Sequence, residues 1–164
     1  MTLIVLDFLA RGVHILGVVI WMGHNYANVV RNPVYKRPQL DAAADAFAAA
    51  SKREHAIFRH SSIVTLITGL YMLWSRDILL DTLTLSGHST VRGIGVWTGL
   101  LMVANLWFVL WPHQKKVLGY VPATVEERLR CSRITFLSSR TNTVLSVPTL
   151  FLMVASTYGT VLID

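Results

Sequence analysis

The chain has 164 residues, 53% of them hydrophobic and only 15% charged, and its mean hydropathy is +0.50. This composition excludes an ordinary soluble domain and is typical of an integral membrane protein. The formal net charge of +6 would suit a nucleic-acid partner, but the basic residues gather in two segments between apolar stretches, so we expect no nucleic-acid binding.

Four apolar stretches are each long enough to cross a hydrocarbon core of roughly 30 Å as a helix of about 20 residues. They lie near residues 4–29, 57–75, 93–112 and 142–162. Their short connections predict one transmembrane domain over residues 1–164, an all-α, up-down-up-down four-helix bundle. We do not expect the first stretch to be a cleavable signal peptide, because it lacks a basic n-region and an A-x-A-like site.

The distribution of basic residues predicts the orientation of the bundle. Residues 31–53 contain five Lys or Arg and residues 113–140 contain six, whereas residues 76–92 contain two. The positive-inside rule therefore places both basic segments in the cytoplasm and both termini on the periplasmic side. A multi-pass protein of the bacterial inner (cytoplasmic) membrane is expected.

The first apolar stretch carries a polar stripe, a set of polar side chains that project within an arc of roughly 140° at 100° per residue. With Gly17 and Trp21, its members are Asp7, Arg11, His14, His24, Asn25 and Asn28. Ionisable groups are costly in lipid, so this face is expected to look at a protein interior or a cofactor. Asp7 and Arg11 are one turn apart, which suits an ion pair, although Arg11 could instead bind a haem propionate or a lipid phosphate.

Three histidines are candidate ligands of haem b. His14 lies nearest the middle of the bilayer, and His24 lies about 15 Å further along the helix axis. His60 enters the second stretch at a depth similar to that of His24. His24 and His60 therefore suit a bis-histidine haem, whereas His14 alone would suit a five-coordinate haem. The sequence leaves these choices open, as it does a His14 that only hydrogen-bonds a neighbouring helix. Arg11 and Trp21 complete the predicted cofactor-binding set.

Other features outside this set predict structure rather than chemistry. An alanine-rich helix is expected over residues 41–51, continuous with the second stretch, and an amphipathic helix over residues 126–138. The spacing of Gly95 and Gly99 permits close helix approach. His55 has charged neighbours and is expected to be solvated. No C-x-x-C, no H-E-x-x-H and no carboxylate pair lies in the apolar stretches, so no catalytic residue is predicted.

Several stretches together resemble the membrane domain of the bacterial cytochrome-c-linked urate oxidase family, the urate oxidase N-terminal domain. They are R-G-V-H-I-L-G-V-V-I-W-M-G-H at 11–24, W-P-H-Q-K-K at 111–116 and S-R-T-N-T-V-L-S-V-P at 139–148. The first helix also resembles HemJ-type protoporphyrinogen oxidases and copper-resistance D proteins, which are haem-associated. Members of the family that this chain resembles carry further spans and a C-terminal cytochrome c. The sequence up to Asp164 has neither, so electrons are expected to leave this chain through a separate protein.

These observations suit three functions. The leading one is a haem-b-binding integral membrane electron-transfer protein, or such a subunit of a larger respiratory or photosynthetic complex, with quinone, a cytochrome c or other membrane subunits as partners. The second is a haem-free accessory subunit whose polar stripe packs on its own bundle or on a partner. The third, supported by the resemblance alone, is a quinone- or cytochrome-coupled oxidase of a purine or porphyrin.

Overall fold

The computed structural model of this chain describes residues 2–30 and 45–158. Within these ranges every element is a helix and there is no strand, which confirms the all-α prediction. The elements are α1 (Thr2–Val30), α3 (Asp45–Trp74), α4 (Leu79–Leu83), η1 (Gly87–Ser89), α5 (Thr90–Ala104), η2 (Asn105–Leu110), α6 (Trp111–Val117), α7 (Val125–Ala155) and η3 (Ser156–Tyr158).

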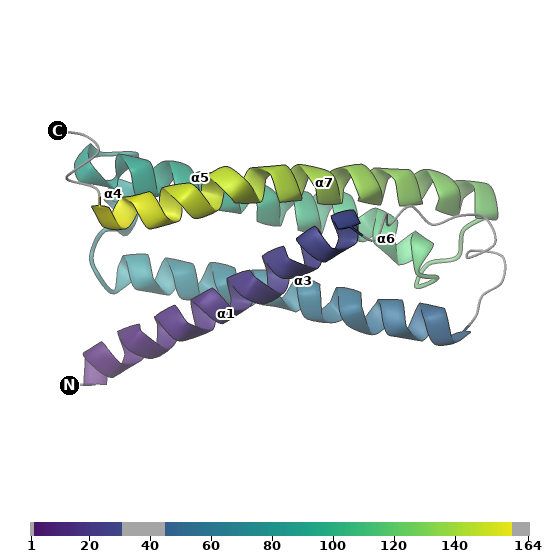
Figure 1. Ribbon diagram of the computed structural model, residues 1–164, viewed down its shortest axis with the longest axis horizontal. Helices are drawn as coiled ribbons and strands as arrows, with labels where there is room; N and C mark the ends of the chain where they lie inside the picture. The colour runs from purple at the N-terminus through teal and green to yellow at the C-terminus, as the bar shows by residue number, and fades with distance from the viewer. Residues whose placement is uncertain (1, 31–44, 159–164) are drawn as a thin grey trace.

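The long helix α3, the helices α5 to α6 and the long helix α7 lie roughly along one common axis, and α1 runs obliquely to it (Figure 1). Because α5, the π-helical η2 and α6 follow one another without a break, they form one continuous rod beside α7. Successive rods run in opposite directions, and α1 begins at the end of the molecule where α7 ends (Figure 1). α1 packs mainly on α3, which it crosses obliquely, and also contacts α7.

Three helical segments are long and apolar enough to cross a membrane: Ile4–Asn28, Lys52–Trp74 and Gly87–Val117. Among the described residues, α7 is not apolar enough to qualify as such a segment, because it carries charged side chains in its first half and small polar side chains on its inward face. They are Ser132, Thr135, Ser138, Ser139, Asn142, Ser146 and Thr149, all buried. The fourth span near 142–162, the four-span bundle and the periplasmic termini therefore stay predictions.

Two helix boundaries that the sequence predicts are absent from the described part of the structure. The alanine-rich segment and the second apolar stretch form the single helix α3 from Asp45, while residues 31–44 lie outside the described residues. The amphipathic segment 126–138 and the fourth stretch likewise form the single helix α7, which continues through Pro148 to Ala155. Neither junction contains a glycine or a proline, so no helix-breaking residue separates the two parts.

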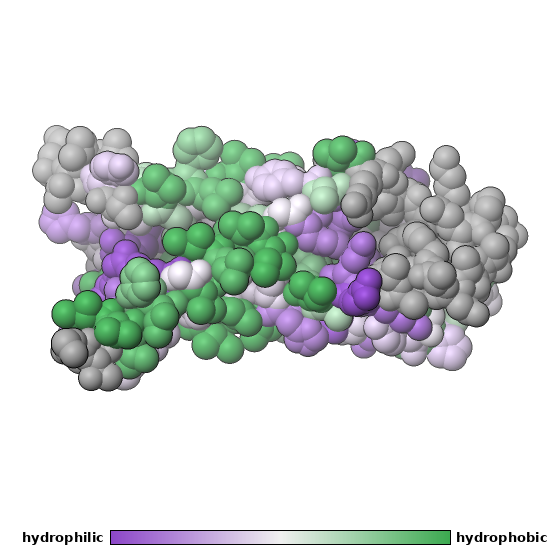
Figure 2. Space-filling view, turned by 60° about the horizontal axis from the view of Figure 1, so that its bottom comes forward, coloured by the Kyte–Doolittle hydropathy of each residue, from purple (hydrophilic) through white to green (hydrophobic). Residues whose placement is uncertain are grey.

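The core lies where α1, α3 and the α5–α6 rod meet. Its buried side chains are Trp21, Met22, Phe58, Met102, Leu106 and Leu110. The outer face of α1 is aliphatic and exposed: Ile4 is 76% and Phe8 72% accessible. Figure 2 shows a broad hydrophobic area across the middle of one face, with hydrophilic side chains on either side of it, as expected for a surface that meets lipid.

A buried polar network joins η2 to α7. Asn105 Nδ2 donates to the carbonyl oxygen of Ser138 at 2.9 Å and to Asn142 Oδ1 at 2.8 Å. Ser138 Oγ donates to Asn105 Oδ1 at 3.0 Å, and Asn142 Nδ2 donates to the carbonyl oxygen of Met102 at 3.1 Å. The network satisfies both amide side chains across the interface, which buried polar groups require.

Glycines allow the closest helix approaches. A Cβ atom at Gly17 would lie 2.5 Å from Thr65 Oγ1, so α1 and α3 meet there at backbone distance. A Cβ at Gly95 would lie 3.2 Å from Leu152 Cβ on α7, whereas one at Gly99 would meet nothing within 4 Å. Of the two glycines predicted to permit close approach, only Gly95 is used in that way.

Candidate functional site

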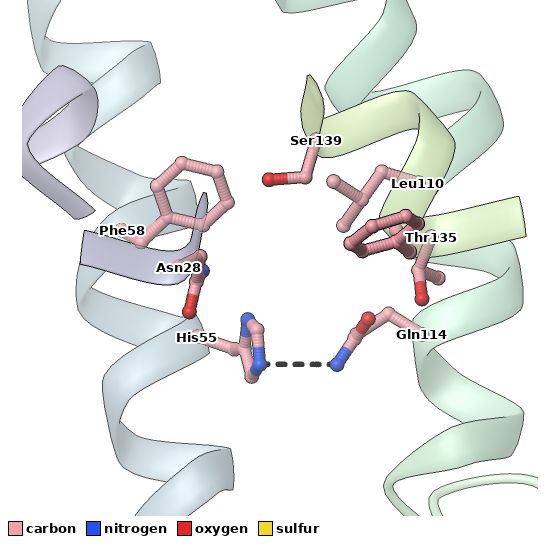
Figure 3. A pocket seen from close by; sticks show the side chains of 8 residues that line it. Asn28, His55, Phe58, Leu110, Gln114, Thr135 and Ser139 are labelled. Carbon is pink, nitrogen blue, oxygen red and sulfur yellow. Dashed lines mark hydrogen bonds between the residues drawn. The ribbon is translucent and has the colours of Figure 1, made fainter. Parts of the chain in front are cut away.

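A small polar pocket opens between α1, α3, the α5–α6 rod and α7 (Figure 3). Its volume is about 30 Å³, which suits one or two water molecules. The side chains that line it are those of Asn28, His55, Phe58, Leu110, Gln114, Thr135, Phe136 and Ser139. The polar lining comes from four separate elements, so the pocket forms only when the helices are assembled.

Two imidazoles meet beside this pocket. The ring of His24 stacks on the ring of Phe58, with centroids 4.6 Å apart and planes 27° apart. The ring of His55 approaches His24 edge-on at 5.3 Å. Asn28 Nδ2 donates to His24 Nε2 at 2.7 Å, and Gln114 Nε2 donates to His55 Nε2 at 3.0 Å. Because an amide nitrogen can only donate, both Nε2 atoms are acceptors, and the two rings are neutral in this arrangement.

Buried polar atoms without a partner gather in the same region. They are His55 Nδ1, Asn25 Nδ2 and Trp21 Nε1, which form no hydrogen bond within the described chain. Asn25 is completely buried, and its Oδ1 accepts a bond from Ser139 Oγ at 3.4 Å. An unpaired buried donor costs about 1–3 kcal/mol, so a water molecule or another acceptor bound in this region would offset that cost.

His55 was expected to be solvated, and that prediction is wrong. Its side chain faces the pocket and Gln114 (Figure 3), and His24 lies against His55 rather than against His60. His55, Phe58 and Ser62 recur at positions i, i+3 and i+7, which places them on one helix face. Phe58 and Ser62 are both buried in the structure. The helical spacing of His55 from these two residues is therefore the feature of the sequence that indicates an inward-facing His55.

His60 lies outside the core, at a groove of about 380 Å³ between α1 and α3. The groove is lined mostly by aliphatic or small residues: Val13, Leu16, Gly17, Ile20, Ala56, Ile57, His60, Ser61 and Val64. His60 Nδ1 lies 2.7 Å from the carbonyl oxygen of Ala56 and must donate to it. The basic nitrogen of this exposed imidazole is therefore Nε2.

His14 packs between α1 and α3. Its Nδ1 lies 2.9 Å from the carbonyl oxygen of Thr65 and 3.2 Å from Thr68 Oγ1. A Cβ at Gly69 would come within 3.0 Å of the imidazole, so the ring lies directly on that glycine. This is the hydrogen-bonded arrangement that the sequence left open. Ligation of haem through Nε2 stays a prediction.

The other predicted site residues occupy separate places. Arg11 Nε donates to Asp7 Oδ2 at 3.1 Å, which confirms the predicted ion pair, and Arg76 binds the same carboxylate. Trp21 is 2% exposed and belongs to the core. The structure thus gathers His24 with His55 but leaves His14 and His60 apart from them. Over residues 2–30 and 45–158, no three His, Cys, Asp or Glu side chains are arranged to hold a metal ion.

The comparison with protein families bears on this arrangement. The family model described as urate oxidase N-terminal matches residues 51–163, which is more than half of the chain. The chain belongs to the urate oxidase N-terminal family. The match contains His55 and His60, together with every residue that lines the small pocket except Asn28.

The urate oxidase N-terminal match begins after α1. The likeness of the first helix to HemJ-type and copper-resistance D proteins therefore stays a prediction, as do the roles of His14 and His24. Neither the search of curated proteins nor the search of solved structures found a match.

Proposed function

We propose that this member of the urate oxidase N-terminal family is an electron-transfer subunit of the bacterial inner membrane that binds haem b. Its four helical rods would cross the membrane with both termini in the periplasm. The observation that carries the proposal is His60, whose Nδ1 is engaged by the carbonyl of Ala56 while its ring lies at an apolar groove. Metal-ligating histidines usually have their second nitrogen held in this way.

The fit of a porphyrin differs between the two cavities. The pocket of about 30 Å³ beside His55 is far too small for a macrocycle, and Phe58 already covers one face of His24. The open groove of about 380 Å³ has the mostly aliphatic lining that one face of a porphyrin requires. His60 is the imidazole that lines the groove, so it is the residue that would hold the haem iron, with His14 and His24 as secondary candidates.

Bound haem would supply reversible one-electron transfer, and the chain would hold it, shield it from water and tune its potential. Arg11, whose side chain is 53% exposed beside Asp7, is the candidate partner of a propionate. The groove is partly open, so a second membrane subunit is the natural cover for a bound macrocycle. Quinone and cytochrome c are the candidate partners in electron exchange.

An oxidised-minus-reduced optical spectrum of the purified full-length chain tests this proposal. We expect a Soret band in the wild-type protein and its loss or displacement in His60→Ala. His113→Ala is a matched control, because His113 Nδ1 bonds to the carbonyl of Val109 at the same 2.7 Å but lies outside the groove. A wild-type protein without a Soret band would overturn haem binding, and a band unchanged in His60→Ala would overturn the ligand.

A haem-free accessory subunit is the second candidate. The bond between His14 and the Thr65 carbonyl favours it, because the polar stripe then closes on the chain's own helices. In that case the protein is colourless and His14→Ala acts on stability alone. Since the enzyme named in the family description is a urate oxidase, urate-dependent reduction of a quinone or cytochrome c is the first activity to assay on the same sample.

A further inference from the structure

Three cations converge on a pair of aromatic rings where α3 faces α6. Trp111 and Tyr120 meet edge to face with their centroids 5.7 Å apart. Arg59 Cζ lies 3.6 Å from the Trp111 centroid, and Lys115 Nζ lies 5.8 Å from it. Lys52 Nζ lies 4.9 Å from the Tyr120 centroid. The residues come from two helices and the turn after α6, so assembly of the helices creates the cluster.

In the described part of the chain, no ion pair joins Lys52, Arg59 or Lys115 to a carboxylate. The ion pairs described there join Arg11 and Arg76 to Asp7, and Lys116 to Glu127. None of them includes Lys52, Arg59 or Lys115. Ring faces attract cations but carry no net charge, so they orient the three side chains without neutralising them. A nearby anion would offset the mutual repulsion of the cations.

The position of the cluster along the helices indicates the source of that anion. Lys52 begins one membrane-crossing segment, and Trp111 and Lys115 lie in the last turns of another, which ends at Val117. This is the depth at which apolar helices meet the lipid headgroups, where Trp, Tyr and basic residues are favoured. Arg59 lies further inside its segment, and its guanidinium is held on the ring of Trp111.

We propose that Lys52, Arg59 and Lys115, held on Trp111 and Tyr120, bind the phosphate group of an anionic phospholipid. Basic pockets between helices at a membrane surface recognise lipid phosphates by charge and hydrogen bonding. The aromatic rings would lie beside the glycerol region while the guanidinium and ammonium groups contact the phosphate. The site does not depend on haem binding and lies apart from the groove at His60.

Thermal unfolding of the full chain in detergent, with added lipid, tests the proposal. Phosphatidylglycerol is expected to raise the Tm of the wild-type protein more than phosphatidylcholine does, because a ligand of the native state stabilises it. Native mass spectrometry should show phosphatidylglycerol retained on the protein. Inorganic phosphate is the third arm, and an effect equal to that of phosphatidylglycerol would assign the site to free phosphate and overturn the lipid.

Substitutions then test whether the difference in Tm between the two lipids arises at Lys52, Arg59 and Lys115. The variant with Lys52→Gln, Arg59→Gln and Lys115→Gln is expected to lose most of the difference between the two lipids. Lys116→Gln should keep it, because Lys116 is the neighbouring residue but pairs with Glu127. Each variant is compared with itself in the two lipids, so a lower starting Tm does not affect the result. Lys52→Gln alone, at a helix end, serves if the triple variant fails to fold. A lipid difference unchanged in these variants would overturn the site.

Discussion

The carboxylate of Asp7 accepts hydrogen bonds from Arg76 Nη2 on both of its oxygens, at 2.9 and 3.0 Å. Arg76 follows the end of α3, so this contact joins the start of α1 to α3. Arg11 approaches the same carboxylate from α1 at 3.1 Å. One acidic side chain therefore holds two cations at the end of the molecule where the chain begins.

Asp7→Asn is expected to lower the Tm, because both cations lose their anionic partner. These side chains are partly exposed, so salt should screen the interaction. The loss should be larger in about 0.1 M salt than in about 1 M salt. Asp77→Asn is the control, because Asp77 is exposed and forms none of the ion pairs described here. A loss that is the same at both salt concentrations would contradict an ionic origin.

Gly17→Ala is expected to destabilise the packing of α1 on α3. The new Cβ would lie 2.5 Å from Thr65 Oγ1 and 3.4 Å from the backbone oxygen of Ser61. Overpacking of this kind costs about 1–3 kcal/mol. Gly12→Ala on the same helix should instead be neutral or stabilising, since nothing lies within 4 Å of its added Cβ.

The double variant Gly17→Ala/Thr65→Ala tests the cause, because it removes the hydroxyl that the new methyl group would meet. We expect it to recover part of the stability lost in Gly17→Ala, measured by thermal unfolding in detergent. Additive losses in the double variant would show that the clash is not at Thr65.

Asn142→Ala should weaken the interface between η2 and α7. The change removes the buried bond to the Met102 carbonyl and the acceptor of Asn105 Nδ2, whose bond is partly buried. Interhelical bonds in membranes average about 0.6 kcal/mol, and unsatisfied buried groups cost more, so a loss of about 1 kcal/mol is expected. Thr141→Ala should change little, because this exposed hydroxyl bonds to Leu137 of its own helix.

The pair of Lys116 and Glu127 makes stability depend on pH. Lys116 Nζ donates to Glu127 Oε1 at 2.5 Å, and this bond holds the pKa of Glu127 below its ordinary value of 4.5. A carboxyl whose pKa is lower in the folded state contributes stability above the unfolded value and loses it as the pH falls through the folded value.

Glu127→Gln should therefore lower the Tm slightly above pH 4.5, where the wild-type carboxylate is charged. The difference between the two proteins should shrink as the pH falls from 4.5 through the lower pKa that Glu127 has in the folded state, because the wild-type carboxylate then becomes protonated. Lys116→Gln should show the same dependence. A Tm difference that grows on acidification would contradict the role of this pair.

Short-range relationships could be predicted from the sequence, and long-range ones could not. The ion pair of Asp7 and Arg11 follows from their spacing on one helix, whereas Arg76 is 69 residues away from Asp7. The depths of His24 and His60 were likewise inferred from helix length. Depth alone does not say which face of α3 points inward, and His55, one turn or so from His60, is the residue that meets His24.

The membrane span of α7 could not be predicted with certainty from the sequence for a different physical reason. Hydropathy measures the average of a helix, but the inward face of α7 is made of hydroxyl groups and Asn142. Their partners lie partly on other helices, as with the bond between Ser139 and Asn25. Polar composition therefore indicates an interior surface in this helix, and neither its span nor its depth can be read from apolarity alone.

The polar inward face of α7 also has a consequence for biogenesis. If α7 entered the bilayer alone, the amide of Asn142 would face hydrocarbon, which gives it no partner, whereas the hydroxyls of Ser146 and Thr149 would keep their bonds to carbonyls of α7 itself. The amide of Asn105 and the carbonyl of Met102, which satisfy Asn142, belong to the rod synthesised just before α7. In the proposed four-span arrangement we therefore expect α7 to enter the lipid together with that rod, as a pair.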